Sequence, residues 1–179
     1  DKKVLIPDLN AGCSLADSCP ADAFVEFVKQ HPGYKVISYV NTSAAVKAHT
    51  DVVVTSSNAK QIVESFPDDE KLIFGPDKNL GNYINGVTGR HMLLWDGACH
   101  VHSQFSLEKI VALKKQYPDA LLLAHPECKR DILLVADKVG STAALLRSAT
   151  QSDCKRFIVA TESGILHEMK KNNPDKEFI

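Results

Sequence analysis

Short runs of consecutive apolar residues recur along the chain, separated by longer stretches in which apolar residues return every three or four positions. The short runs lack polar alternation, so they predict strands that are buried on both faces. The predicted strands are residues 3–9, 35–39, 51–54, 71–74, 91–95, 120–124, 138–139 and 156–160. Strand–helix alternation of this kind predicts α/β units, three layers deep (α/β/α), with parallel sheets between helices.

Helix signals lie between these strands. Residues 21–30 place their large apolar side chains on one face, and Ser106 is a typical N-cap for the stretch that follows it. Ser57 and Ser141 predict two further helix starts. The segment 85–89 holds two glycines and is the best candidate for a linker.

Two cysteines occupy matching places in two similar stretches of chain. The strand-like run 4–8 leads to Cys13, the run 92–96 leads to Cys99, and the two cysteines are 86 positions apart. A repeat of this kind indicates that two related units each present one thiol at an equivalent spot. Two thiols from two quasi-symmetric units suggest a shared centre between them.

The same offset holds elsewhere in the chain. His31-Pro32 and Tyr117-Pro118 stand at the same offset, so the proline recurs 86 positions later. A shared offset at such distant points predicts two α/β units, a first one over residues 1–88 and a second over residues 89–179.

Composition limits the possible partners. The 179 residues are 44% apolar, which is enough for one ordinary core or two small ones, and the net charge is −1. This charge offers no basic surface for nucleic acid, and no apolar run approaches the roughly 20 residues that cross a membrane. Five cysteines are an odd number for a disulfide framework, so we expect reduced thiols in a cytoplasmic protein. The chain starts within a strand pattern, so we expect it to be a piece of a longer protein.

Polar residues gather directly after the predicted strands. They are Cys13, Tyr39, Asn41, Ser56, Asp77, Cys99, His125, Glu127, Thr142 and Thr161. Open parallel sheets bind ligands outside the carboxyl ends of their strands. Both units therefore present polar groups on the edge where a ligand is expected.

The repeated cysteines are the candidate metal ligands. A thiol at a strand end, just before a helix, lies where the thiolate is favoured. The other three cysteines have no counterpart in the second copy and are expected to pack as small apolar residues. Residues 99–102 contain one cysteine and two histidines, like a fragment of a zinc site, but the spacing does not match the common finger patterns.

A second group is suited to proton transfer. His125 and Glu127 lie two apart on an extended segment held by Pro126, and could act as general acid and general base. Tyr39 and Asn41 hold the equivalent positions of the first unit. The serine and threonine residues at predicted helix starts favour an anion, such as phosphate or carboxylate, with plain N-capping as the alternative.

The motifs resemble those of the quinolinate synthase family. The resemblance covers essentially the whole chain, in order, at residues 7–17, 39–44, 55–59, 76–81, 97–102, 125–127, 140–142 and 160–165. It implies three α/β/α domains in a pseudo-threefold arrangement around one site, of which this chain holds two and largely lacks the third. It also implies a [4Fe–4S] cluster on three cysteines, with Cys13 and Cys99 as two ligands and the third outside this chain.

The resemblance further implies a transferase-type, dehydrating enzyme of NAD (pyridine nucleotide) biosynthesis. The family condenses iminoaspartate with dihydroxyacetone phosphate to quinolinate, losing phosphate and water, and an aspartate-oxidising enzyme supplies the first substrate. An open iron of the cluster serves as Lewis acid. Glu127 would transfer protons, assisted by Tyr39 and His125, and this chain alone would be inactive. The implied substrate-binding residues are Tyr39, Val40, Asn41, Ser56, His125, Pro126, Glu127 and Thr142.

Two other functions compete with this one. A non-enzymatic module that binds dicarboxylates or phosphate would use the helix starts but leave Cys13, Cys99, His125 and Glu127 without a role. A thiol hydrolase would pair His125 with Cys99 or Cys128.

Overall fold

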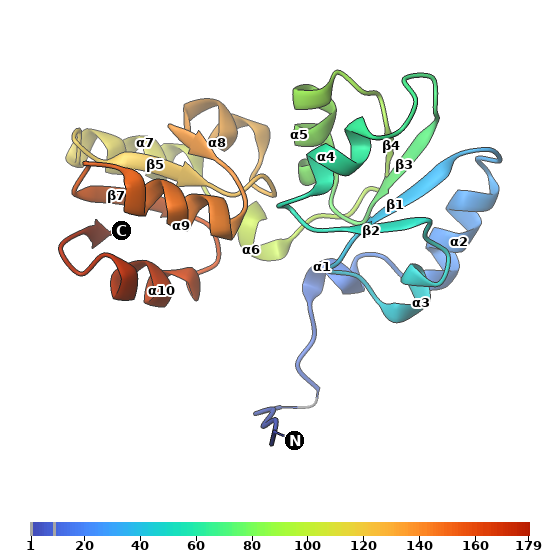
Figure 1. Cartoon of the computed structure of the whole chain (residues 1–179), viewed down its shortest axis with the longest axis horizontal. Coiled ribbons are helices and arrows are strands. Elements are labelled where there is room, and N and C mark those ends of the chain that lie inside the picture. The colour runs from blue at the N-terminus through green and yellow to red at the C-terminus, as the bar shows by residue number, and fades with distance from the viewer. Residues whose placement is uncertain (1, 9) are drawn as a thin grey trace.

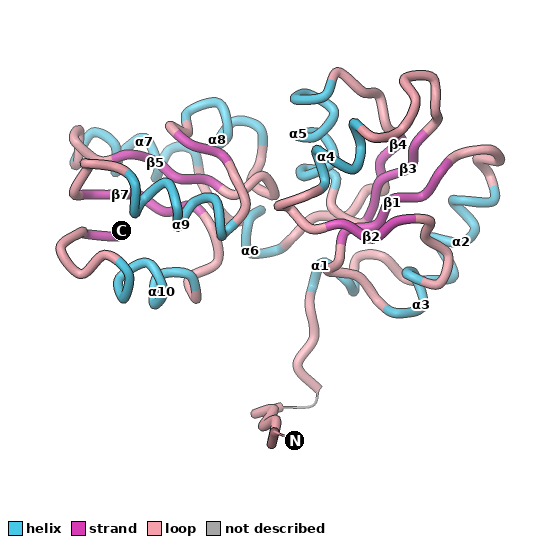
Figure 2. The backbone as a smooth tube through the Cα atoms, viewed as in Figure 1, coloured by secondary structure: helices cyan, strands magenta, loops and turns pink. Residues whose placement is uncertain are grey.

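The computed structural model describes residues 2–8 and 10–179 and has two α/β units side by side (Figure 1). Each unit holds one four-stranded parallel sheet between helices (Figure 2), as the sequence predicts. No helix in the described part of the chain is long and apolar enough to cross a membrane.

The first sheet has the strand order β2-β1-β3-β4. Its unit contains α1 (Ser14–Asp17), α2 (Ala21–Lys29), β1 (Lys35–Tyr39), α3 (Ala44–Lys47), β2 (Val52–Val54), α4 (Ala59–Glu64), β3 (Leu72–Gly75), α5 (Lys78–Thr88) and β4 (Leu93–Leu94).

The second sheet repeats this topology in the order β6-β5-β7-β8. Its elements are α6 (His100–Ser103), α7 (Leu107–Gln116), β5 (Leu121–Ala124), α8 (Arg130–Val135), β6 (Lys138–Val139), α9 (Thr142–Gln151), β7 (Arg156–Ala160), α10 (Ile165–Asn172) and β8 (Glu177–Phe178).

One aspartate performs the same structural task in each unit. Asp51 precedes β2, and its Oδ2 accepts a hydrogen bond of 2.7 Å from the backbone N–H of Val36. Asp137 precedes β6, and its Oδ2 accepts the equivalent bond of 2.7 Å from Leu122. Both pairs are related by the offset of 86 positions found in the sequence. The repeat therefore extends from the cysteines to the hydrogen bonds that fix strand register.

The predicted first strand is wrong over the described residues 3–8, which form no strand, and Leu9 lies outside the described residues. Val4, Leu5 and Ile6 are 81%, 90% and 61% exposed. An apolar run becomes a strand only when a neighbouring strand takes its backbone hydrogen bonds. No described strand pairs with residues 3–8, and the segment extends away from both units (Figure 1).

Strand β4 belongs to the first sheet, although the boundary expected after residue 88 puts it in the second unit. Leu93 and Leu94 pair with Ile73 and Phe74 of β3. The second sheet also ends in a two-residue strand, because β8 pairs with β7. The hydrophobic pattern did not predict β8. A two-residue strand is too short for periodicity to identify, and here pairing with the neighbouring strand defines it.

The predicted linker at 85–89 is wrong, because residues 85–88 form the end of helix α5. Asp77 caps this helix by accepting a hydrogen bond of 2.7 Å from Leu80 N–H, and Leu80 and Ile84 are buried. Gly89 ends it with φ of +70°, a conformation that glycine adopts without strain. The buried helix face outweighs the glycine-rich composition of the segment.

The predicted helix starts fare differently. Ser106 and Ser141 each accept a hydrogen bond from the backbone three residues on, as N-caps do. Helix α4 instead begins at Ala59 with Asn58 as its N-cap residue, so the start predicted at Ser57 is misplaced by one residue.

Arg90 binds the chain segment that follows helix α4. Its guanidinium donates to the carbonyls of Pro67 at 2.7 Å and Asp68 at 2.8 Å, and also to that of Phe66. The side chain is only 11% exposed. One guanidinium thus satisfies several backbone acceptors of the turn that follows α4, and its charge strengthens these hydrogen bonds.

We expect Arg90→Lys to lower the free energy of unfolding by about 2 kcal/mol, because an ammonium group cannot reproduce the planar fork of donors. Urea unfolding followed by circular dichroism measures this. Arg147→Lys is the matched control, since Arg147 is exposed and should change stability by no more than about 0.5 kcal/mol. An equal, small effect of both substitutions would contradict the role given to Arg90.

Candidate functional site

Buried polar side chains from both units meet between the two sheets. Tyr39 at the end of β1 is 6% exposed, and His125 and Glu127 after β5 are 3% and 2% exposed. His125 Nε2 lies 3.2 Å from Ser56 Oγ, which follows β2 of the other unit. The carboxyl ends of the two sheets therefore supply one shared cluster, at the place where parallel sheets carry their ligands.

The turn after β5 is held against β7. His125 N–H donates to Ala160 O at 3.1 Å, and Cys128 N–H donates to His125 O at 2.9 Å. The Cys128 thiol also donates to Ala160 O, at 3.3 Å. These bonds fix the backbone between His125 and Glu127, with the buried Pro126 between them, so both side chains are presented from a rigid turn.

His125 has a defined tautomer. The Glu127 backbone N–H donates to His125 Nδ1 at 3.4 Å, so Nδ1 is an acceptor. The other ring nitrogen, Nε2, then carries the proton and donates to Ser56 Oγ. The Glu127 carboxylate approaches the same ring, with Oε1 at 3.8 Å from Nδ1.

His102 joins the cluster from helix α6. Its Nδ1 lies 2.9 Å from Glu127 Oε2, and its Nε2 lies 3.0 Å from Thr161 Oγ1. Its ring stacks on that of His125, with centroids 4.9 Å apart and an interplanar angle of 26°. The sequence did not predict the contact between His102 and Thr161. The signals it did hold were the cysteine–histidine pattern at residues 99–102 and the place of Thr161 directly after a predicted strand.

Asp77 positions Cys99. It is fully buried, and while its Oδ1 caps α5, its Oδ2 accepts a hydrogen bond of 2.9 Å from Cys99 N–H. Gly97, two residues before Cys99, packs closely against the backbone of Pro76, since a Cβ at this position would lie 2.5 Å from Pro76 O. The backbone that carries Cys99 is therefore bound to the first sheet.

The cluster changes the acidity of its members. Burial lowers the pKa of His125 to about 4, so this imidazole is neutral near pH 7. Burial would raise the pKa of Glu127, but the neighbouring His102, His125 and Tyr39 bring it below its usual value. Burial raises the pKa of Tyr39 far above its usual range, and the Glu127 carboxylate raises it further. At neutral pH the site thus holds a carboxylate, a neutral imidazole and a phenol.

The pKa values of His102 and Asp77 are also shifted from their usual values. Burial opposes the charged form of His102, but contacts with Cys99 and the Glu127 carboxylate raise its pKa to about 9. Burial raises the pKa of Asp77 to about 6, although the backbone donors of Leu80 and Cys99 act in the opposite direction.

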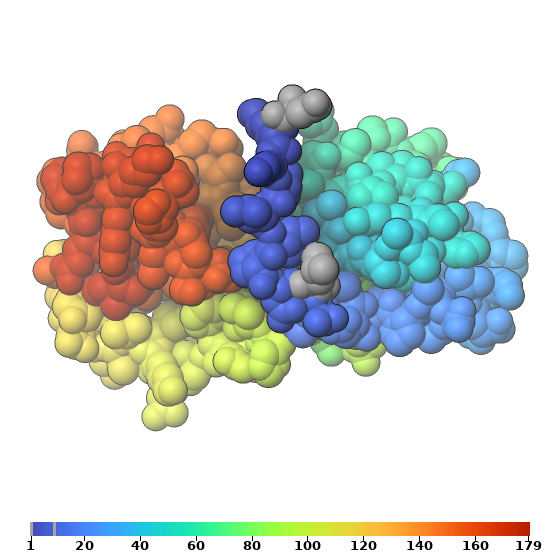
Figure 3. All heavy atoms as spheres, turned by 90° about the horizontal axis from the view of Figure 1, so that it is seen from below, coloured from blue at the N-terminus to red at the C-terminus, as the bar shows by residue number. Residues whose placement is uncertain are grey.

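Other predicted site residues are more exposed than this buried cluster. Asn41 and Thr142 are exposed, and Val40 is 38% exposed. Cys13 is exposed at the N-cap of α1, and Cys99 is half-buried at the N-cap of α6. Seen from below, the N-terminal residues that lead to Cys13 lie in front of the junction between the units (Figure 3).

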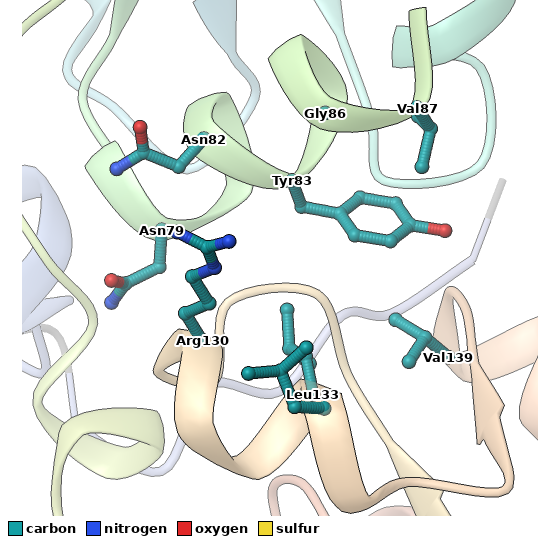
Figure 4. Close-up of a pocket in the computed structure, with 9 residues that line it drawn as sticks. Asn79, Asn82, Tyr83, Gly86, Val87, Arg130, Leu133 and Val139 are labelled. Carbon is teal, nitrogen blue, oxygen red and sulfur yellow. The ribbon is translucent and has the colours of Figure 1, made fainter.

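A cavity of about 550 Å³ lies between helices α5 and α8. Asn79 and Tyr83 line it from α5, and Arg130 and Leu133 line it from α8 on the opposite side (Figure 4). None of the clustered titratable residues contributes to it, so the cavity and the buried cluster are separate features.

Comparisons with known proteins give one consistent result. The family model described as "Quinolinate synthetase A protein" (NadA) matches residues 1–179. The chain is 56% identical over 179 residues to quinolinate synthase of Thermosynechococcus vestitus and 55% identical over 179 residues to that of Chloroherpeton thalassium. It is 54% identical over 178 residues to that of Synechocystis sp..

These matches cover 99–100% of this chain but 56% of each relative. The chain thus spans about half the length of the curated relatives that it matches. Because the family model matches every residue of the chain, the chain belongs to the quinolinate synthetase A family.

Proposed function

We propose that this chain is part of a quinolinate synthase, which condenses iminoaspartate with dihydroxyacetone phosphate to quinolinate in NAD biosynthesis. The observation that carries this proposal is the buried cluster of Glu127, His125, Ser56 and Tyr39, to which both units contribute. Relatives named quinolinate synthase align with the whole chain. The proposal implies a cytoplasmic enzyme and an aspartate-oxidising enzyme that supplies iminoaspartate.

Glu127 is the proposed proton-transfer base. Its neighbours keep it ionised in a site from which water is largely excluded, so it can accept a proton from a carbon or nitrogen of the bound intermediate. Tyr39 remains protonated, so its phenol can act as a proton donor beside Glu127. His125, neutral and hydrogen-bonded to Ser56, orients the serine hydroxyl toward substrate rather than carrying charge.

The thiols of this chain fit two ligand positions of a [4Fe–4S] cluster. Cys13 and Cys99 both precede a short helix and retain solvent access. Cys19 and Cys128 are poor ligands, because burial raises their pKa values to about 11 and 12. The Cys154 thiol donates to the backbone carbonyls of Asp119 and Arg156, at the ends of β5 and β7 opposite to the site. When bound with one iron open, such a cluster supplies a Lewis acid for carbonyl and hydroxyl groups.

The competing functions fit the geometry less well. An anion-binding module would use the free backbone N–H groups at the start of α9. The hydroxyl of Ser141 already accepts a hydrogen bond from one of them, that of Ala144. A hydrolase that pairs Cys128 with His125 would need a thiolate, and burial keeps that thiol protonated at neutral pH.

Replacing Glu127 by glutamine in the full-length enzyme should lower kcat about 10²- to 10⁴-fold, because an amide cannot accept the proton. Quinolinate formation by the anaerobically reconstituted enzyme measures this. Glu168→Gln is the control, since Glu168 is exposed on α10. A variant at Glu127 with normal kcat and a full complement of iron would remove this residue from the mechanism.

Cys13→Ala and Cys99→Ala should each abolish cluster binding and turnover in the full-length enzyme. Cys154→Ala should leave both intact and is the matched control, because the Cys154 thiol donates to the backbone carbonyls of Asp119 and Arg156 and has no part in the proposed ligand set. Iron and sulfide analysis together with the visible absorption of the cluster gives the readout. Retention of the cluster in either of the first two variants would refute the ligand assignment.

The 179-residue chain alone should neither keep an intact cluster nor form quinolinate. Two thiolates leave the cubane one protein ligand short of the proposed three. Iron and sulfide are measured after anaerobic reconstitution and desalting, with the full-length protein treated in parallel. A stable four-iron cluster on the isolated chain would contradict the expectation.

A further inference from the structure

Three donor atoms of different chemistry converge beside the buried cluster. Cys99 Sγ, an imidazole nitrogen of His102 and a carboxylate oxygen of Glu127 all lie within 4.8 Å of one another. The side chains of His102 and Glu127 are 7% and 3% exposed, whereas Cys99 is half-buried. The nitrogen and oxygen donors of His102 and Glu127 are therefore buried, and the sulfur of Cys99 lies on the side more open to solvent.

The orientation of His102 is typical of a metal ligand. One ring nitrogen, Nε2, is held 3.0 Å from Thr161 Oγ1. The other, Nδ1, is buried and forms no hydrogen bond within the described residues, although Glu127 Oε2 is 2.9 Å away. Metal-binding histidines use one nitrogen as ligand while the other is fixed by an oxygen partner.

We propose that the cluster-free protein binds one zinc ion through Cys99 Sγ, His102 Nδ1 and a carboxylate oxygen of Glu127. A thiolate, an imidazole and a carboxylate are all zinc ligands, and together the two anions balance the charge of the ion. Bonds of about 2.0–2.3 Å in a tetrahedron hold donor atoms roughly 3.3–3.8 Å apart, which small side-chain movements reach from the present separations. The fourth position stays open for water or an anion.

This site differs from the proposed cluster site in its ligands. It uses His102 and Glu127, which hold no iron in the cluster assignment, and it does not use Cys13. It shares Cys99, so the zinc ion and the cluster exclude each other. Bound zinc would also immobilise Glu127, so it would block both cluster assembly and the proposed proton transfer.

The scaffold around the donors is already ordered. Asp77 holds the backbone of Cys99, and Thr161 holds the ring of His102. The turn that carries Glu127 is bonded to β7 through His125 and Cys128. Ligands that are held in place before binding lose little conformational freedom when an ion arrives.

The test uses cluster-free full-length protein under anaerobic, reducing conditions, with Co²⁺ as a spectroscopic substitute for Zn²⁺. We expect one ion per chain, the ligand-field bands of a tetrahedral site, and one thiolate-to-cobalt charge-transfer band. Zinc affinity follows from competition with a chromophoric chelator. Cys99→Ser should abolish the charge-transfer band, and His102→Ala and Glu127→Gln should each weaken zinc binding at least about 100-fold.

Two further variants separate the possible outcomes. Cys13→Ala should leave zinc affinity within about twofold, whereas Thr161→Val should weaken it about 10- to 100-fold, as loss of a ligand's supporting hydrogen bond does. An equal loss of zinc affinity in Cys13→Ala and Cys99→Ser would place the ion on the two proposed cluster thiols and overturn the proposal. So would unchanged affinity in Glu127→Gln.

One measurement needs no variant and therefore does not depend on whether a variant folds. X-ray absorption of the zinc-loaded wild-type protein should show one sulfur and two or three nitrogen or oxygen neighbours. Two or more sulfur neighbours, or no saturable binding, would refute the site. None of these readouts involves quinolinate, so a failure here leaves the proposed reaction to its own tests.

Discussion

The buried carboxylate of Glu127 is the constraint on which the arrangement of the site depends. A carboxylate taken out of water is unstable unless charged or hydrogen-bonding groups surround it. Its partners come from three separate places, His102 in α6, His125 in its own turn and Tyr39 at the end of β1. Satisfying this single group therefore fixes α6 and the ends of both sheets relative to one another.

The repeated fold makes this convergence possible. Both sheets have the same strand order, and Asp51 and Asp137 hold equivalent strands in the same register. Each unit thus delivers polar side chains to the carboxyl ends of its strands at matching positions. Because the two units present these edges to one shared region, Ser56 of the first can bond His125 of the second.

The sequence predicts most of the strands, because uninterrupted runs of β-branched and leucine residues are typical of strands that are covered on both faces. It fails where pairing decides the outcome. Residues 4–8 and 92–96 look alike, yet only the second run contains a strand, since β3 offers it an edge. His125 and Glu127 could be predicted because they directly follow a strand. The contacts of His102 could not be predicted, because its partner Thr161 is distant in sequence and meets it only in the folded chain.

The same features that suit Glu127 to proton transfer also expose it to a competing cation. Its carboxylate must remain ionised, which requires imidazole neighbours, and it lies close to a thiol that the proposed cluster uses. A thiolate, an imidazole and a carboxylate that lie this close together form a set of soft and borderline ligands that binds zinc readily. A cluster on Cys99 removes the sulfur from that set. If Cys99 is a ligand of both metals and Glu127 is the base, as proposed, the order in which metals reach this cysteine decides whether Glu127 remains free to accept a proton.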